Sequence, residues 1–273
     1  MTRLMLLLAV GLFASLGQAA TIEDGWGRDV HIEGHPRRVA ALAPHLAESL
    51  FALGIGDRVV AAVSFTDYPA AARQVPRVGD ALALSWESLT ALRPDLILVW
   101  GATLTRERLA RLEGMGVPVY VSEPRSLSDV ERELRVLAEA LGGDLAIAEA
   151  FAARLAALSA GGEERPLRVL PLISASPLMT LSRGHFVDDL LARCGAVNPF
   201  AVAAGPVVRL SSERLLRSEL DLILNLGTAP LPDNLHLPRS VMVADLDPDL
   251  FVRPGPRVIE GAEALCGLLG ELP

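Results

Sequence analysis

Short runs of apolar residues recur along the chain and alternate with segments in which apolar residues return every three or four positions. The runs cover residues 38–43, 58–63, 117–122, 167–173 and 241–245. Runs of this length without polar alternation are typical of strands buried on both faces of a parallel sheet. Between them, segments such as 45–54 and 185–195 have helical spacing and end in glycine. Alternating strands and helices predict an α/β fold with parallel sheets.

One stretch of this pattern occurs twice. The segment Leu84–Gly101 reads LSWESLTALRPDLILVWG, and Leu210–Gly227 reads LSSERLLRSELDLILNLG, with nine of 18 positions identical. In each copy a serine, Ser85 or Ser211, is suited to cap the helix that follows it. Each helix leads into the apolar run Asp-Leu-Ile-Leu, which ends just before a glycine. The duplication predicts two similar sheets, one in each half of the chain.

The two halves are separated by a helix-forming stretch, residues 126–166, which is interrupted by two glycines at 142–143. Its second part, residues 144–160, would be about 25 Å long at about 1.5 Å per residue. A helix of this length can connect two lobes. We therefore expect a signal peptide at residues 1–20, an N-terminal lobe at 21–143, a connecting helix at 144–162 and a C-terminal lobe at 163–273.

The first 20 residues have the pattern of a secretory signal. Arg3 precedes an apolar run from residue 4 to 16, and small residues follow at Ala19 and Ala20. The run is too short to span a bilayer comfortably, although a retained anchor is the alternative. We expect cleavage, no lipid attachment because no cysteine lies near the cut, and an exported, soluble protein.

Composition narrows the choice of partners. The formal charge of −8 over 273 residues argues against nucleic acid or an anionic membrane as the partner. The two cysteines, Cys194 and Cys266, favour a disulfide in an exported chain, and two buried thiols are the alternative. A loop of 72 residues closed in this way would stabilise the fold by about 4 kcal/mol.

Sequence signatures of catalysis are absent. The chain contains no nucleotide-binding glycine motif, no serine-hydrolase elbow and no zinc-protease motif. Its five histidines have no metal-ligand spacing; they are His31, His35, His45, His185 and His236. The sequence therefore indicates a binding protein with no metal and no cofactor, and an exported α/β enzyme of an unrecognised type is the alternative.

Together these features resemble the helical-backbone class of periplasmic substrate-binding proteins, which serve ABC importers of metal chelates. The resemblance runs from about Arg38 to the C-terminus. Its most specific segments are RRVAALAPHLAESLFALG, SFTDYPAAARQVPRVGD, LSWESLTALRPDLILVW, LLARCGAVNPF and DLFVRPGPRVIEGAEALC. It implies two similar α/β lobes with central sheets, joined by one long helix, with the ligand cleft between them. The triplet Asp67-Tyr68-Pro69, Trp100 and the paired cysteines are most similar to members that bind corrinoids such as cobalamin (vitamin B12).

The resemblance also implies a ligand site. Trp100 ends a buried strand, at the edge where open α/β sheets bind ligands, and its indole offers a flat apolar surface. A core cap is the alternative for Trp100. An asymmetric corrinoid would explain why the second copy of the repeat has Leu226 at this position. The full set implied by the resemblance is Tyr68, Trp100, Pro44, Met179, Asp249, Leu250, Phe251, Val252 and Arg253, in which Asp249 and Arg253 would hydrogen-bond amides and phosphate.

Some residues depart from the corrinoid-binding pattern. Two further cleft tryptophans of that group correspond to about Ala81 and Val207 in this chain. Binders of haem and of ferric siderophores share the fold, and haem capture commonly uses a tyrosine or histidine on iron. Tyr68 and His45 are candidates for that role. Haem is therefore the main alternative ligand.

The resemblance assigns a second role to the repeat. Glu87 and Glu213 occupy equivalent places in its two copies and would contact arginines of a two-fold symmetric permease dimer, which works with its ATPase. The alternative is that each glutamate only favours the dipole of its helix. We expect the protein itself to be a monomer.

Overall fold

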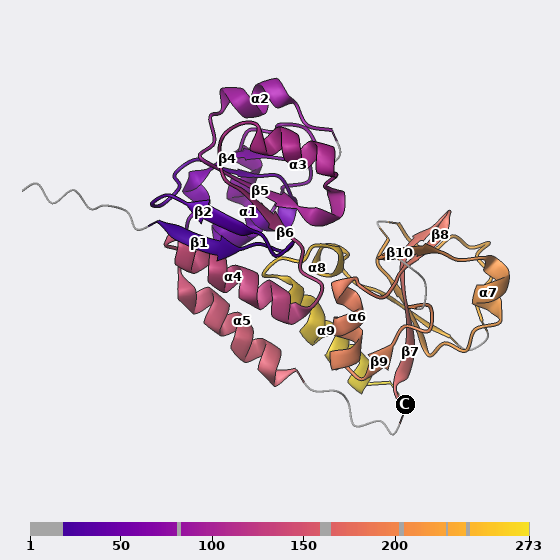
Figure 1. Ribbon diagram of the computed structural model, residues 1–273. Helices are drawn as coiled ribbons and strands as arrows, with labels where there is room; N and C mark the ends of the chain where they lie inside the picture. Colours follow the sequence, from indigo (N-terminus) through magenta and orange to yellow (C-terminus); the bar gives the residue numbers. More distant parts are fainter. Residues whose placement is uncertain are drawn as a thin grey trace, which may run out of the picture.

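The computed structural model describes residues 19–80, 83–158, 165–201, 205–227, 229–238 and 241–272 (Figure 1). The expected signal peptide lies outside these residues except for its last two, and Ala20 already opens the first strand. Ala81, one of the two positions expected to have lost a tryptophan, also lies outside them. No helix among the described residues is long and apolar enough to cross a membrane.

The N-terminal lobe is built on a parallel sheet with the strand order β4-β3-β5-β6. Its strands are β3 (Val39–Ala41), β4 (Val59–Ala62), β5 (Leu96–Trp100) and β6 (Val119–Ser122), preceded by a hairpin of β1 (Ala20–Glu23) and β2 (Asp29–Ile32). Its helices are α1 (Pro44–Ala52), α2 (Trp86–Ala91), α3 (Arg106–Glu113) and α4 (Leu127–Leu141). All three residues of β3 are buried, as predicted from its unbroken apolar run.

The C-terminal lobe has a mixed sheet, with the order β10-β8-β7-β11-β12 and with β9 paired to β7. Its strands are β7 (Leu167–Ala175), β8 (Leu178–Leu181), β9 (Ala196–Val197), β10 (Val207–Arg209), β11 (Leu222–Asn225) and β12 (Met242–Asp245). Its helices are α6 (Phe186–Arg193), α7 (Ser212–Leu216), α8 (Asp249–Val252) and α9 (Val258–Gly270). Strands β7, β11 and β12 are parallel, but β8 and β10 run antiparallel. A two-residue link between β7 and β8 allows only an antiparallel pair.

The predicted connecting helix is α5 (Leu145–Ala157). It is separated from α4 by Gly142, whose φ of 68° lies in the left-handed region that ends many helices. Asp144 caps α5 by accepting a hydrogen bond from the amide of Ala146, at 3.0 Å. The helix ends at Ala157, because Leu158 already has an extended backbone with ψ of 122°, so α5 is shorter than the predicted helix 144–162. The predicted boundaries of the two lobes stay a prediction.

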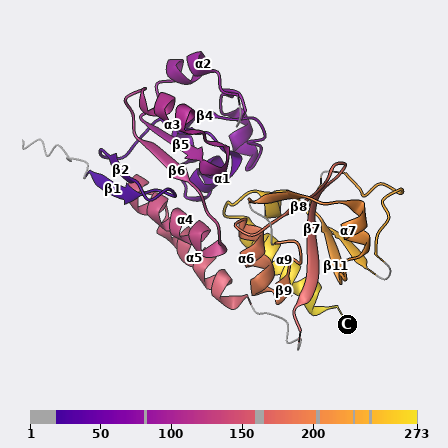
Figure 2. The same ribbon diagram turned by 45° about the vertical axis from the view of Figure 1, so that its right-hand side comes forward.

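Four helices form a layer that belongs to both lobes. Helix α4 contacts α5 and α6, and α9 contacts α5 and α6 (Figure 2). Apolar residues of both lobes form one continuous core through this layer, including Leu46 and Leu134 from the first lobe and Phe251 and Leu265 from the second. The outer face of each sheet has a smaller core of its own.

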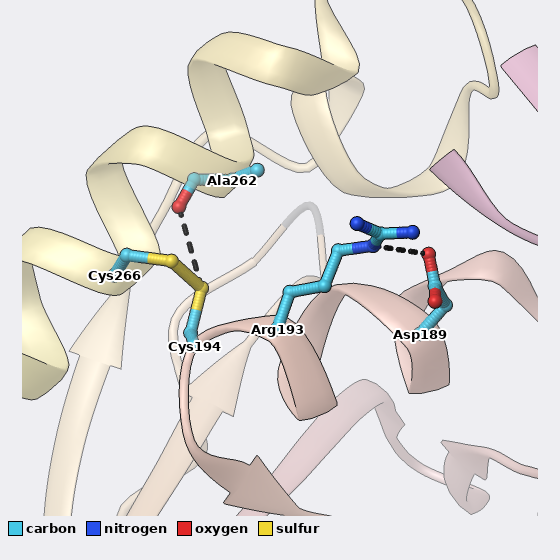
Figure 3. Close-up of a disulfide and its surroundings, with 5 residues drawn as sticks. All are labelled: Asp189, Arg193, Cys194, Ala262 and Cys266. Carbon is cyan, nitrogen blue, oxygen red and sulfur yellow. Dashed lines mark hydrogen bonds and ion pairs between the residues drawn. A yellow bond between two sulfur atoms is a disulfide. The ribbon is translucent and has the colours of Figure 1, made fainter. Parts of the chain in front are cut away.

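The disulfide predicted between Cys194 and Cys266 is present and joins the end of α6 to α9, with 4.7 Å between the two Cα atoms (Figure 3). Asp189 of α6 pairs with Arg193 at 2.9 Å and accepts a hydrogen bond from the amide of Leu127, also at 2.9 Å. Helix α6 is thus fixed covalently to α9 and by hydrogen bonding to the start of α4.

The repeated segment has a structural role that accounts for its aspartates. Asp95 accepts a hydrogen bond from the amide of Arg38, just before β3, at 2.8 Å. Asp221 accepts one from the amide of Arg168, in β7, at 2.7 Å. Each arginine side chain also donates to a backbone carbonyl that follows the repeat helix, at 2.6 Å in both lobes. Each copy is therefore hydrogen-bonded to the first strand of the central sheet in its lobe, or to the residue just before that strand.

Candidate ligand site and docking surface

The N-terminal lobe places its candidate ligand residues at the carboxyl edge of its sheet. Pro44 opens α1 directly after β3, Trp100 ends β5, and Tyr68 lies in the loop after β4. Because the carboxyl ends of parallel strands lie at the same edge of the sheet, these residues all lie at that edge. Tyr68 is 47% exposed and Trp100 is half-buried, whereas Leu226, the counterpart of Trp100, is buried in the core. At the position where the two copies of the repeat differ, the first copy therefore has a partly exposed aromatic residue and the second a buried aliphatic one.

Sequence reasoning missed Phe65 in the same loop. Its side chain is 76% exposed, and its backbone has φ of 64°, a conformation that is uncommon for a bulky residue. The loop is fixed around it, because Ser64 donates to the carbonyl of Gly79 at 3.1 Å and the guanidinium of Arg77 donates to the carbonyl of Thr66. An exposed aromatic residue on a well-bonded loop is suited to binding. The signal available in the sequence was the phenylalanine near the start of SFTDYP, the segment that follows the apolar run 58–63.

His45 is buried beneath Trp100. Its ring lies edge-on to the indole, with centroids 5.3 Å apart, and its Nε2 is 3.2 Å from the hydroxyl of Ser122. Burial, and then the charge of Arg253, lowers the pKa of His45 to about 3. His45 is therefore an uncharged support for Trp100. It is not placed to bind the iron of a haem, which was one of its expected roles.

Arg253 connects the two lobes at this edge. Its guanidinium lies 2.7 Å from Asp67 of the N-terminal lobe and 3.0 Å from Asp249 of α8, and only 12% of its side chain is exposed. The hydrogen bond from Arg253 lowers the pKa of Asp67, whereas burial raises the pKa of Asp249 in spite of the same cation. The closer partner of Arg253 is thus Asp67, across the lobe boundary.

The other candidate ligand residues are less uniform in position. Leu250 and Val252 of α8 are half-buried, and Met179 lies half-buried in β8 opposite Ser174, near the carboxyl end of β7. Phe251 is fully buried in the core, so we remove it from the candidate contacts. Val207, the described position that was expected to have lost a tryptophan, is 41% exposed in β10.

The two candidate docking residues lie on corresponding helices. Glu87 and Glu213 are exposed in the first turns of α2 and α7, which are capped by the side chains of Ser85 and Ser211. These helices lie at the outer ends of the two lobes, away from α5 (Figure 1). Glu213 pairs with Arg217 at 2.9 Å. Among the described residues Glu87 has no ion-pair partner, so the two carboxylates are unequally available.

No group of three potential metal ligands occurs among the described residues. The arrangement is one of exposed aromatic rings and a cross-lobe arginine at the facing edges of two sheets. These features define a two-lobed solute-binding protein. A model of the periplasmic binding protein family matches residues 39–237, and the chain belongs to this family. The family is one of binding proteins, which confirms that the chain is not an enzyme.

Curated relatives include the vitamin B12-binding protein of Pectobacterium atrosepticum, which is 30% identical over 250 residues, covering 87% of this chain and 90% of that protein. The vitamin B12-binding protein of Vibrio cholerae serotype O1 is 29% identical over 245 residues, covering 85% and 88%.

Solved structures confirm the predicted two-lobed α/β fold. The periplasmic vitamin B12-binding protein of Vibrio cholerae matches with a TM-score of 0.76 and 27% identity, over 86% of this chain and 96% of that one. The periplasmic haem-binding protein RhuT from Roseiflexus sp. RS-1 matches with a TM-score of 0.73 and 25% identity, over 86% and 98%.

Proposed function

We propose that this protein captures a corrinoid, cobalamin or a close analogue, and delivers it to the permease of an ABC importer. The observation that carries the proposal is that Phe65 and Tyr68, in the loop after β4, and Trp100, at the end of β5, are partly exposed at the carboxyl edge of one sheet. Arg253 of the other lobe pairs with Asp67 of the same loop. A corrin ring is broad, flat and largely apolar, with amides around its edge. Aromatic faces suit the ring, and charged groups such as Asp249 and Arg253 suit amides and phosphate.

The relatives support this choice of ligand, because two vitamin B12-binding proteins match over most of the chain at about 30% identity. Phe65 adds to the argument, since it supplies an aromatic surface in a chain that lacks tryptophan at Ala81 and Val207. A pocket with phenylalanine in place of indoles would make the same kind of apolar contact over a smaller area. We therefore expect the corrinoid to be held with fewer aromatic contacts than in a site with three tryptophans.

Haem is the second candidate, and one observation favours it. Tyr68 is 47% exposed, and its hydroxyl has no hydrogen-bond partner among the described residues, so it is open to bind iron, as tyrosine does in some haem proteins. Solved haem-binding proteins match this chain at 25% identity. In this reading Tyr68 is the iron ligand, and His45 takes no part.

Equilibrium dialysis of the purified protein against cyanocobalamin, dicyanocobinamide, haemin and ferrichrome separates these candidates. We expect retention of the cobalt corrinoids and no shifted Soret band with haemin; the reverse would overturn the corrinoid assignment. Tyr68→Ala and Trp100→Ala should each weaken corrinoid binding by about 1–3 kcal/mol. Trp86→Phe on the distant α2 is the matched control and should bind as the wild type does.

The same proposal covers delivery and location. Glu87 and Glu213 would contact arginines on the two halves of a permease dimer, and the ATPase of that importer would drive release. The protein would act as a periplasmic monomer after removal of residues 1–20. Intact mass of the protein recovered from the periplasm tests the cleavage, and light scattering of that sample tests the monomer.

A further inference from the structure

We propose that Arg257, a residue of the C-terminal lobe, is a positioning residue that holds the ring of Tyr68, a residue of the N-terminal lobe, in its ligand-binding orientation. The inference rests on the proposed function, because it explains how one of the proposed contacts is prepared. The guanidinium carbon of Arg257 lies 3.8 Å from the centroid of the Tyr68 ring. A cation over the face of an aromatic ring is attracted to it electrostatically.

Arg257 is itself held in a fixed plane by Glu48 of α1. Its Nε lies 3.0 Å from one carboxylate oxygen of Glu48, and its Nη2 lies 2.9 Å from the other. The side chains are 3% exposed for Glu48 and 14% exposed for Arg257. A bidentate pair of this kind fixes both the position and the orientation of the guanidinium. The cation that covers Tyr68 is therefore rigid.

The backbone leading to Arg257 is pressed against α1. A Cβ atom on Gly255 would lie 3.2 Å from the Cβ of His45 and 3.4 Å from a carboxylate oxygen of Glu48. Arg253, at the start of the same segment, pairs with Asp67, the neighbour of Tyr68. The segment 253–257 thus contacts the N-terminal lobe at the loop that carries Tyr68 and at α1, and Arg257 keeps its place as long as the two lobes keep theirs.

Tyr68 needs such a support because it lies on a loop with nearly half of its side chain exposed. A side chain that is mobile before binding must lose rotational freedom when the ligand arrives, which weakens binding. Arg257 occupies one face of the ring and so leaves the other face for a ligand. The contact made by Tyr68 consequently depends on the relative position of the lobes, since its support comes from the opposite lobe.

A double-mutant cycle with cyanocobalamin tests the positioning role. Removing the cation should lower affinity about 2- to 12-fold, the range expected when one side chain must be ordered on binding. In a Tyr68→Ala background the same change should have little further effect, because the two residues act as a unit. Additive losses would overturn the proposal, since they would mean that Arg257 affects the site without acting through Tyr68.

The choice of variants keeps the fold intact. Arg257→Ala would leave Glu48 buried without a partner, so the cycle uses Glu48→Leu/Arg257→Met, which replaces the ion pair with apolar groups. Arg257→Lys retains the charge but loses the planar bidentate geometry, and we expect partial loss. The control is Arg154→Ala. Arg154 and Arg257 both line a cavity of about 360 Å³ beside Tyr68, at the junction of the two lobes. Arg154 of α5 pairs with Glu263 of α9 and makes no contact with the Tyr68 ring that would position it. The control variant should bind as the wild type does.

A second measurement needs no ligand. The chain has two tyrosines, Tyr68 and Tyr120, so 3-fluorotyrosine labelling gives two ¹⁹F resonances, assigned with Tyr68→Phe. Glu48→Leu/Arg257→Met should move the Tyr68 resonance toward the value of free fluorotyrosine and leave that of Tyr120 in place. A Tyr68 resonance that is already at the free value in the wild type would overturn the positioning role. If no corrinoid binds, the proposed function fails, but this spectrum still decides the role of Arg257.

Discussion

Replacing Glu133 with glutamine should make the protein less sensitive to rising pH. Glu133 lies in α4 with 7% of its surface exposed and is hydrogen-bonded to Ser122 and Tyr120. Burial raises the pKa of its carboxyl from 4.5 to about 7. At about 1.36 kcal/mol per pKa unit, this shift corresponds to about 3 kcal/mol.

The sign follows from the raised pKa. Below pH 4.5 the carboxyl is protonated in both the folded and the unfolded chain, and its burial carries no charge penalty. Between pH 4.5 and about 7 the unfolded chain releases the proton first, so the stability contribution is lost as pH rises through this window. Glutamine remains neutral throughout and removes this dependence.

Urea unfolding followed by circular dichroism, at pH 5, 6, 7 and 8 and constant salt, measures the effect. The free energy of unfolding of Glu133→Gln minus that of the wild type should increase by up to about 3 kcal/mol from pH 5 to pH 8. Taking the difference cancels the titration of all other groups. A difference that stays constant with pH would refute the reasoning.

His45 provides an internal control of opposite sign in the same hydrogen-bond network. Because its pKa is lowered from 6.5 to about 3, its contribution is fully present above pH 6.5 and is lost as pH falls. The free energy of unfolding of His45→Gln minus that of the wild type should therefore increase as pH falls, whereas the corresponding difference for Glu133→Gln increases as pH rises. The same unfolding series checks both, and slopes of equal sign would contradict the assignment.

Two further predictions concern covalent stability and docking. The Cys194→Ser/Cys266→Ser variant should lose about 4 kcal/mol of unfolding free energy, since the bond closes a separation of 72 residues; an unchanged urea midpoint would contradict this. Glu87→Lys/Glu213→Lys should abolish uptake into vesicles that contain the transporter while ligand affinity is unchanged, and normal uptake would exclude docking. Glu87→Ala should impair uptake more than Glu213→Ala, because the exposed Arg217 competes with the permease for the carboxylate of Glu213; equal losses would argue against this asymmetry.

Local patterns in the sequence were sufficient for much of the fold. Ser85 and Ser211 cap their helices as predicted, and most of the unbroken apolar runs became buried strands. The run at 241–245 is an exception: it forms β12, but Met242 and Val243 are exposed, because β12 is the last strand of its sheet. Strands β8 and β10 were not predicted, since neither lies in one of the apolar runs and each is defined by antiparallel pairing with a neighbour. A short segment outside an apolar run carries little periodicity that would identify it as a strand.

In the candidate site, too, some residues could be predicted from the sequence and others could not. Trp100 could be placed from sequence because it ends a buried strand, and strand ends mark ligand sites. Glu48 could not be recognised, because its partner Arg257 lies 209 residues away and only tertiary packing brings them together. In the sequence Glu48 is indistinguishable from a solvated position on an amphipathic helix.

The pairing of Glu48 with Arg257 has a consequence for the order in which the chain matures. The two residues are 209 positions apart in the sequence, and a buried charge without its partner costs about 3–5 kcal/mol. Until Arg257 has docked, α1 cannot take up its final packing with Glu48 ionised. Although each lobe has its own sheet, the first lobe completes its structure only when Arg257 is in place, and a fragment that stops before Arg257 lacks the counter-charge it needs.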